Sequence, residues 1–241
     1  MNLPAGLDFV GIRIDAHDVV RISTFWADLM GWTLEDRADG AIAVVSNRPS
    51  SYPLAIVASA TPKRAQNRIH FDLTTGSSDG MAQLLSHAYA LGAIDVDIGQ
   101  SPEEPHRVLA DPEGNEFCVI EPENRFLADT GAIGAINCDG SRAVGYFWSA
   151  ALGWPLVWDQ DEETAIQAPS GGSKITWSGP PLMPRSGRDR LRFELSTTGL
   201  ISAAVVRLIS LGARLGQKPA SSDAVLYDPD GNEFHLVRTR R

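Results

Sequence analysis

The sequence predicts an α+β fold made of two tandem modules, each holding two βαβββ units. The first observation is a turn that occurs twice: residues 111–117 read DPEGNEF and residues 228–234 read DPDGNEF, identical at six of seven positions. The second is a helix end that occurs twice, since residues 25–32 (FWADLMGW) match residues 147–154 (FWSAALGW) at a separation of 122. A third match, RIHFDL with RLRFEL, has the same separation. Matches in the same order along the chain indicate two homologous modules.

The domain boundaries follow from this repeat. We expect module 1 at residues 1–121, a linker at 122–131 and module 2 at 132–241. Within module 2, a proline-rich loop at 179–189 is expected to cover a cavity.

The elements of module 1 follow from local patterns. Residues 7–15 alternate and are rich in Val and Ile, which is typical of a strand. Asp18 is placed to cap a helix that ends near Met30, with Gly31 as the left-handed residue after it. The other expected elements are a strand opening at Trp32, strands at 41–46, 53–59, 68–74, 107–110 and 116–121, and a helix at 78–91.

Module 2 is expected to repeat this order. Its predicted strands are 132–138, 154–159, 164–168, 174–178, 190–196, 225–227 and 233–238, and its predicted helices are 141–152 and 199–211. The repeated turn starts the last strand of each module, because Asp accepts backbone N–H bonds, Pro presets φ and Gly-Asn tolerates positive φ. The turns therefore deliver Glu116 and Glu233 at the start of otherwise apolar strands.

Composition and charge limit the classes of function. The chain has 241 residues, a net charge of −9 and a pI of about 5.0, which argues against nucleic acid as a partner. We find no stretch long enough to cross a membrane and no cleavable signal. Cys118 and Cys138 form neither a disulfide framework nor a CxxC metal motif. We therefore expect a cytoplasmic protein whose partner is a small molecule.

Strand parity predicts where polar side chains gather, because successive residues of a strand point to opposite faces. If helices cover the apolar faces, each curved sheet becomes a cup lined by polar residues. One cup is expected to hold His70, Asp72 and Glu116, and the other Arg192, Glu194, Glu233 and His235. The alternative is that these faces are merely hydrated. The recurrence of the pattern in both modules favours the cups.

The three repeated motifs together resemble the glyoxalase / bleomycin-resistance / extradiol-dioxygenase superfamily, also called vicinal oxygen chelate proteins. The resemblance covers nearly the whole chain, as two modules. It implies that paired βαβββ units form cup-shaped, half-open barrels. It also implies a divalent metal on the cup floor, held by a His of the first strand, a His or Glu of a middle strand and a Glu of the last strand.

Carried over residue by residue, this metal set is incomplete. The last-strand Glu is present as Glu116 and Glu233, but the middle His is present only as His70, with Arg192 in the second copy. Phe9 stands where the first-strand His is expected. His70 and Glu116 alone are fewer than the three ligands that a catalytic metal normally needs. If a divalent metal is bound, the resemblance implies Fe, Zn, Ni or Mn.

The candidate ligand-pocket residues are aromatic and acidic. Trp158 and Trp177 have no counterpart in module 1, so we expect them to form walls of a pocket. Phe9 and Asp72 are expected beside them, since Phe9 replaces a cup-floor residue and Asp72 shares the face of His70.

Three functions remain open. The first is a metal-free protein that binds a hydrophobic or cationic small molecule. The second is a divalent-metal-dependent lyase or dioxygenase of the glyoxalase/extradiol type, with His70 and Glu116 as ligands. The third is a metal-free acid–base enzyme in which His235 and Glu233 transfer protons and Arg192 stabilises an anion. In the last case the alternative is that Arg192 and Glu233 form a salt bridge that plugs the second cup.

We favour a protein that binds or transforms a small organic molecule without a complete metal site. Two modules in one chain can form both cups, so a monomer and a homodimer are both compatible with the sequence.

Overall fold

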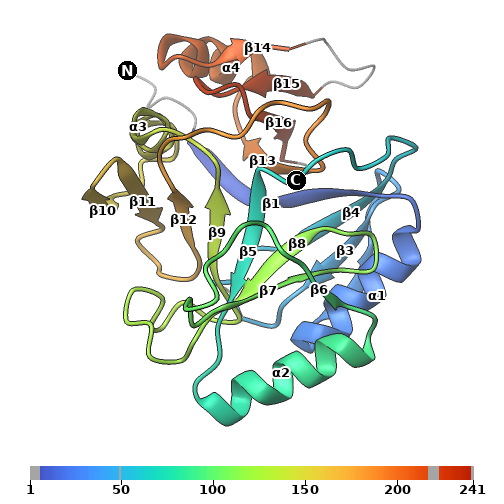
Figure 1. Ribbon diagram of the computed structural model, residues 1–241. Coiled ribbons are helices and arrows are strands. Elements are labelled where there is room, and N and C mark those ends of the chain that lie inside the picture. The colour runs from blue at the N-terminus through green and yellow to red at the C-terminus, as the bar shows by residue number, and fades with distance from the viewer. Residues whose placement is uncertain (1–5, 49, 217–222, 240–241) are drawn as a thin grey trace.

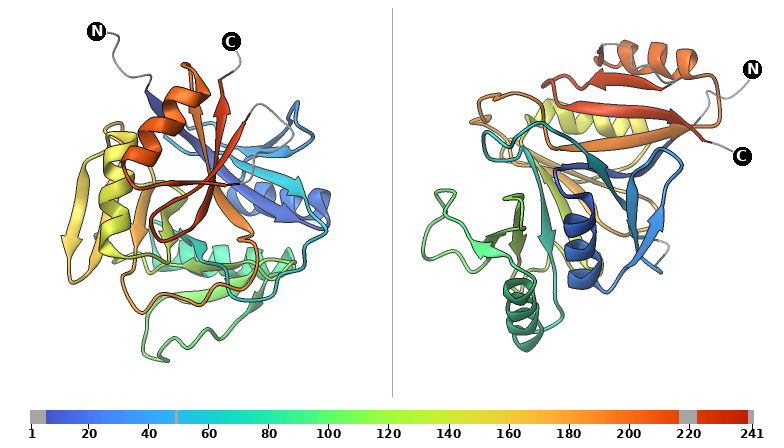
Figure 2. Two further views of the ribbon diagram at one scale, coloured as in Figure 1. Left: turned by 90° about the horizontal axis from the view of Figure 1, so that it is seen from above. Right: turned by 90° about the vertical axis from the view of Figure 1, so that its right-hand side faces the viewer.

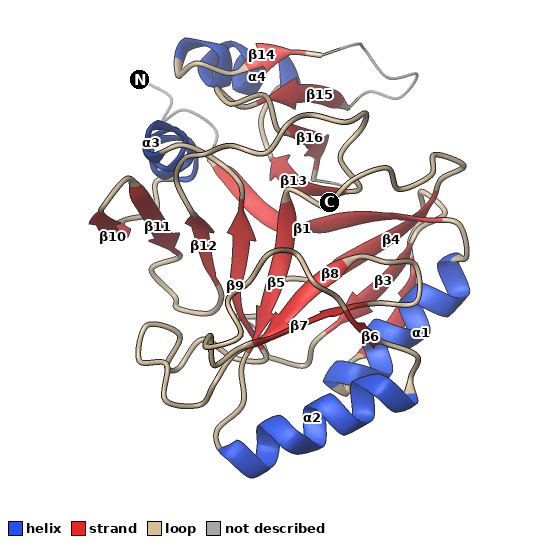
Figure 3. Cartoon of the chain, viewed as in Figure 1, coloured by secondary structure: helices blue, strands red, loops and turns tan. Residues whose placement is uncertain are grey.

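The computed structural model describes residues 6–48, 50–216 and 223–239. Within this part of the chain, two eight-stranded mixed sheets and four helices form an α+β fold (Figure 1 and Figure 3). The helices are α1 (Val19–Met30), α2 (Ser78–Ala90), α3 (Arg142–Leu152) and α4 (Ile201–Ser210). Figure 1 and the right view of Figure 2 place α4 at one end of the molecule and α2 at the other.

Sheet A is made of strands from the beginning and the end of the chain. Its members are β1 (Leu7–Ala16), β2 (Thr33–Asp36), β3 (Ile42–Val45), β4 (Leu54–Ala58), β13 (Leu191–Thr197), β14 (Arg214–Leu215), β15 (Ala224–Tyr227) and β16 (Glu233–Arg238). They lie in the order β14-β15-β16-β13-β1-β4-β3-β2. The antiparallel pair β1–β13 joins the two halves and sets Arg13 opposite Arg192.

Sheet B is made of strands from the middle of the chain. Its members are β5 (Ile69–Leu73), β6 (Ile94–Asp95), β7 (Arg107–Ala110), β8 (Glu116–Val119), β9 (Ile133–Cys138), β10 (Leu156–Gln160), β11 (Glu163–Gln167) and β12 (Lys174–Trp177). They lie in the order β10-β11-β12-β9-β5-β8-β7-β6. The antiparallel pair β5–β9 joins the two halves and sets His70 opposite Asn137.

Each sheet therefore takes one βαβββ unit from each half of the chain. Strands β1–β4 pair with β13–β16, and β5–β8 pair with β9–β12. The predicted α+β fold of two tandem modules is confirmed, and neither sheet closes into a barrel within the described residues. The sharing of each sheet between the modules was not predicted, because alternation along a strand identifies its apolar face but not its neighbour.

The predicted strands and helices agree with the observed bounds to within two residues. Asp18 caps α1 by accepting the Arg21 backbone N–H at 3.0 Å, and Gly31 adopts the left-handed conformation with φ of 64°. The sequence reading missed β6 and β14. Both are two-residue strands with exposed side chains, so they carry no alternating pattern.

The core lies between the two sheets. Helix α1 packs on β3 and β4 of sheet A, while its Trp26 ring contacts Phe71 and Phe117 of sheet B at centroid distances of 5.3 Å. Helix α3 packs on β11 and β12 of sheet B, while its Trp148 ring contacts Phe193 of sheet A at 4.9 Å. The core side chains thus lie on one face of each sheet. The polar side chains on the opposite face line the two cups.

In each module the repeated helix end and the repeated turn are joined by a hydrogen bond. In module 1 the Trp26 indole Nε1 donates to Asp111 Oδ2 of the repeated turn at 3.2 Å. In module 2 the Trp148 Nε1 donates to Asp228 Oδ2 at 3.3 Å. Both carboxylates are buried, and burial raises the pKa of each, to about 6 for Asp228. These contacts give the recurring sequence a structural explanation.

The third residue of each turn caps a helix of the same module. Glu113 accepts the backbone N–H groups of His17 and Asp18 at 3.0 and 2.7 Å, just before α1. Asp230 accepts the backbone N–H of Ser141 at 2.6 Å, just before α3. A carboxylate in this position satisfies an N–H group that the helix leaves free and interacts favourably with the helix dipole.

Among the described residues, every helix is too short or too polar to pass through a bilayer.

Candidate ligand site

Sheet B carries a cup of polar side chains on its outward face. His70 and Asp72 belong to β5, and Glu116 and Cys118 belong to β8, each alternating with residues of the core. The parallel pairing of these strands sets Asp72 opposite Cys118. Asp72, Glu116 and Cys118 are buried and His70 is half-buried. The structure thus brings together the three polar residues predicted for this cup.

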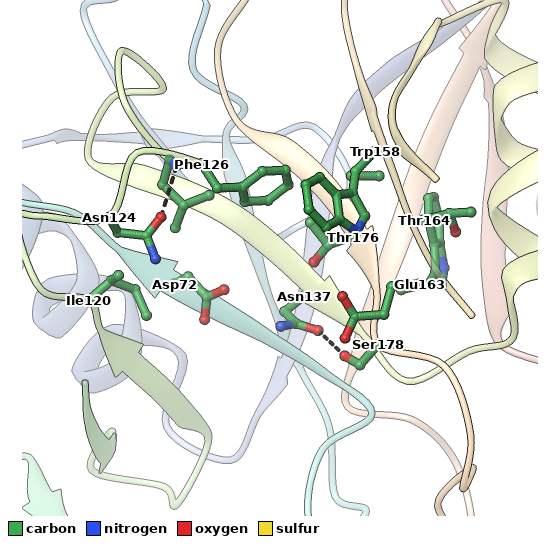
Figure 4. A pocket seen from close by; sticks show the side chains of 13 residues that line it. Asp72, Ile120, Asn124, Phe126, Asn137, Trp158, Glu163, Thr164, Thr176 and Ser178 are labelled. Atoms are coloured by element: carbon green, nitrogen blue, oxygen red, sulfur yellow. Dashed lines mark hydrogen bonds between the residues drawn. The ribbon is translucent and has the colours of Figure 1, made fainter. Parts of the chain in front are cut away.

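A cavity of about 280 Å³ lies beside this cup (Figure 4). Asp72 and Ile120 line it from module 1, Trp158 and Thr176 line it from module 2, and Phe126 lines it from the linker. The size is suited to a small organic molecule. The segment 122–131 contributes Asn124, Phe126 and Leu127 to the lining of this cavity. The loop at 179–189, which was expected to cover a cavity, lines a different and smaller one of about 30 Å³.

The polar groups around the cavity are carboxylates, amides and hydroxyls. Asp72 and Glu163 both line it, and no Lys, Arg or His is among the lining residues that the structure describes. The Oγ1 atom of Thr176 is buried without a hydrogen-bond partner in the described part of the chain. Asn137 accepts the Ser178 hydroxyl at 2.7 Å. The two lining carboxylates favour a ligand that is basic or donates hydrogen bonds, and the nearby Lys174 ammonium lies over the ring of Phe126, 4.0 Å from its centroid.

Two aromatic rings form one wall. Trp158 is 38% exposed, and its ring lies 5.7 Å from that of Phe126 at an interplanar angle of 71°. Trp177 also borders the cavity, but its side chain is 1% exposed and belongs to the main core. Of the two tryptophans expected as walls, Trp158 therefore has the more accessible ring.

Phe9 lies elsewhere, in contrast to its expected place in the pocket. Its ring packs in the core against Tyr52, Trp154 and Phe193. The expectation rested on the place of the first-strand His in the resemblance. The register of β1 shifts between Phe9 and Gly11, so Phe9 faces the core although simple alternation would put it on the same face as Arg13.

Sheet A carries the second cup, whose buried acids are held in ion pairs and which borders a cavity of about 360 Å³ lined by Arg37, Asp39 and Glu194 among others. Glu194 is 2% exposed and lies between two guanidinium groups, Arg13 at 2.5 Å and Arg37 at 2.7 Å. Arg192 is 1% exposed and contacts Asp15 at 2.5 Å. Each buried charge in this cup therefore has an oppositely charged neighbour.

Glu233 occupies the other end of this cup. Its Oε1 atom lies 3.0 Å from Arg188, 3.3 Å from Arg192 and 3.1 Å from His235. Burial opposes the charged carboxylate, but the hydrogen bonds from His235 and Arg188 and the nearby guanidinium charges outweigh it and lower the pKa of Glu233 to about 2. A carboxylate with so low a pKa is a weak base. The cluster of Arg192, Glu233 and His235 therefore resembles a plug more than an acid–base pair.

Comparison with known proteins places this fold in a family. A family model described as a glyoxalase-like domain matches residues 11–120 and 134–237. The chain belongs to the glyoxalase-like family. Glyoxalase I from Zea mays has a similar structure, with a TM-score of 0.67, 14% identity, and coverage of 97% of this chain and 93% of that chain. A putative dioxygenase from Bacillus subtilis subsp. subtilis str. 168 has a TM-score of 0.59 at 13% identity, covering 97% of this chain and 86% of that chain. No curated protein matches the chain.

The metal implied by the glyoxalase-like resemblance does not fit the pair His70 and Glu116. Glu116 Oε1 contacts Lys63 Nζ at 2.5 Å, and Oε2 accepts the Asn67 backbone N–H at 3.1 Å. The Lys63 ammonium neutralises the carboxylate and repels a second cation. The residue opposite His70 on the neighbouring strand β9 is Asn137, whose neutral amide is a weaker metal ligand than a His or a carboxylate. Among the described residues, one group with suitable spacing is His70, Asp72 and Cys118.

Several residues around this site were not predicted from the sequence. Asn137 and Thr176 are in strands that were predicted, so the alternation that identified His70 would also have indicated them. Phe126 lies in the linker and Lys63 lies in a loop between β4 and β5, where no periodic pattern fixes the direction of a side chain. Their positions depend on how these segments pack against the finished sheets.

Proposed function

We propose that this glyoxalase-like protein binds a small organic molecule in the cavity over sheet B. The observation that carries the proposal is the cavity itself, which combines an accessible aromatic wall with buried polar groups. The cup of sheet A supports it by contrast, because its acids are paired with guanidinium groups.

The lining indicates the class of ligand. Trp158 and Phe126 favour an aromatic or flat apolar body. Asp72 and Glu163 favour a hydrogen-bond donor or a basic group on that body, and the Thr176 hydroxyl offers a further polar contact. A ligand carboxylate or phosphate would be repelled by the two acids. We infer a small aromatic compound that carries an amine or an equivalent donor.

Binding assays on the full chain test this proposal. Isothermal titration with a panel of aromatic amines and their neutral, isosteric alcohols is expected to show preferential binding of amines. Trp158→Ala should weaken binding about tenfold, because it removes the aromatic wall. Tyr89→Ala is the matched control, since Tyr89 is also 38% exposed but lies on α2 outside the cavity. If Trp158→Ala binds the compounds as tightly as the parent protein, the proposed site is wrong.

A further inference from the structure

His70, Asp72 and Cys118 form a compact group of potential ligands on the floor of the sheet B cup. Each offers one ligand atom, and these atoms all lie within 4.8 Å of one another. They come from two hydrogen-bonded strands, β5 and β8, with Asp72 directly opposite Cys118. Paired strands hold their side chains on a rigid base, as a metal site requires.

Asp72 differs from the acid in the corresponding place of the other sheet. Glu194 of β13 is paired with Arg13 and Arg37. Asp72 is 8% exposed, and its charged neighbour is the imidazole of His70 at 3.4 Å. Among the described residues, no guanidinium or ammonium group is paired with Asp72, in contrast to Glu194. This site therefore favours the arrival of a cation.

The same group is displaced from the position that the family resemblance implies. That position pairs His70 with Glu116, and Glu116 is already occupied by Lys63 and Asn67. Two residues further along β5 the same face carries Asp72, and two residues further along β8 it carries Cys118. The proposed ligand set keeps His70, adds Asp72 and replaces Glu116 with Cys118. The displaced position also adjoins the cavity, because Asp72 lines it.

We propose that His70, Asp72 and Cys118 bind a divalent metal ion of the Zn²⁺ type. One imidazole nitrogen, one carboxylate oxygen and one thiolate sulfur are ligands that Zn²⁺ accepts together, and three protein ligands leave a fourth position open toward the cavity. On binding, the Cys118 thiol releases its proton to solvent and the sulfur bonds to the metal. The metal would occupy Asp72, which is also one of the two carboxylates proposed to attract a basic ligand. Metal binding is therefore measured without the organic ligand, and amine binding is measured on the metal-free protein.

Titration of the metal-free full chain with Zn²⁺ and Co²⁺ tests this inference. We expect one equivalent of either ion to bind, and bound Co²⁺ to show the near-ultraviolet charge-transfer band of a thiolate ligand. Cys118→Ser and Asp72→Asn should each weaken Zn²⁺ binding at least tenfold. Cys138→Ser is the matched control, because Cys138 is the second buried cysteine and lies on the core face of β9. It should leave binding unchanged.

Three results would overturn the inference: a parent protein that binds no metal, a Co²⁺ complex without the thiolate band, or a Cys118→Ser variant that binds as the parent does. Glu116→Gln separates the two ligand sets, since loss of metal binding in this variant would favour the family-type position instead. Circular dichroism checks whether each variant is folded. If Cys118→Ser is unfolded, the Co²⁺ spectrum of the parent protein and the Zn²⁺ affinity of Asp72→Asn test the inference in its place. Trp158→Ala should bind the metal as the parent does. Failure of the organic-ligand proposal can therefore be distinguished from failure of the metal proposal.

Discussion

Glu233 is a buried carboxylate whose ionisation is coupled to folding. The hydrogen bonds and charges of His235, Arg188 and Arg192 overcome the cost of burial and lower its pKa from 4.5 to about 2. A carboxylate whose pKa is lower in the folded state stabilises the fold above the unfolded-state pKa. That contribution is lost as the pH falls from about 4.5 toward 2.

Glu233→Gln should therefore destabilise the protein in a pH-dependent way. Removing the charge leaves Arg188 and Arg192 without their partner, which we expect to cost about 3 kcal/mol at pH 7. The difference from the parent should shrink as the pH approaches 2, because the parent carboxylate is then protonated as well. Urea unfolding of both proteins between pH 3 and 7 measures this. A difference that stays constant over this range would contradict the assigned ion pairs.

At this scale, alternation along predicted strands was sufficient to place His70, Asp72 and Glu116 on one face. It did not show what each group contacts. Lys63, which neutralises Glu116, comes from a loop 53 residues earlier, and the pairing depends on the final path of that loop. The sequence therefore predicted which residues share the cup but not which basic groups pair with its carboxylates.

The repeated turn links a strand to a helix in each module. Its first Asp accepts a hydrogen bond from the Trp26 or Trp148 indole. Its third residue, Glu113 or Asp230, caps the first helix of the same module, α1 or α3. Ser141 precedes α3 without a side-chain cap of its own, so Asp230 supplies the acceptor from a distant turn.

Asp230→Ala should destabilise the protein by about 1 kcal/mol, the usual cost of losing a helix cap. Glu113→Ala should cost more, because Glu113 also pairs with the buried Arg190 at 2.6 Å. Thermal unfolding of the two variants measures both effects. Equal losses, or a larger loss for Asp230→Ala, would disagree with these contacts.

The helices and strands with a clear period were predictable, and the segments that cover the sites were not. Asn124, Phe126 and Leu127 line the cavity over sheet B, although the segment around them has a sequence typical of a linker. The loop at 179–189 instead sends Arg188 into the cup of sheet A. Coverage of a site by a loop is decided by tertiary packing, which local propensity does not describe.

The two halves of the chain are interlocked at the scale of the whole molecule. Each sheet is completed at its centre by a strand pair from different modules, β1–β13 in one and β5–β9 in the other. The division into residues 1–121 and 132–241 is a proposal from the repeat, and these sheets imply that the modules depend on each other.

A fragment of residues 1–121 should not form a folded monomer. Alone it would expose the inner edges of both half-sheets, which are unpaired strand edges prone to association. We expect it to be unfolded or self-associated, and to regain the native circular dichroism spectrum when mixed with residues 122–241. Sedimentation and circular dichroism test this. A stable, monomeric and fully folded fragment would show that the shared sheets are not required.

The two cups of this molecule differ in the charges beside their acids. In sheet A the acids face guanidinium groups, whereas in sheet B Asp72 and Glu163 border a cavity whose described lining residues include no Lys, Arg or His. We infer that the sheet B cup is the working site.

A crystal structure of the full chain with an aromatic amine selected by titration tests this inference most directly. The compound should lie against Trp158 and Phe126, with its donor group within hydrogen-bond distance of Asp72 or Glu163. A compound bound instead in the cup of sheet A, among Arg13 and Glu194, would contradict it.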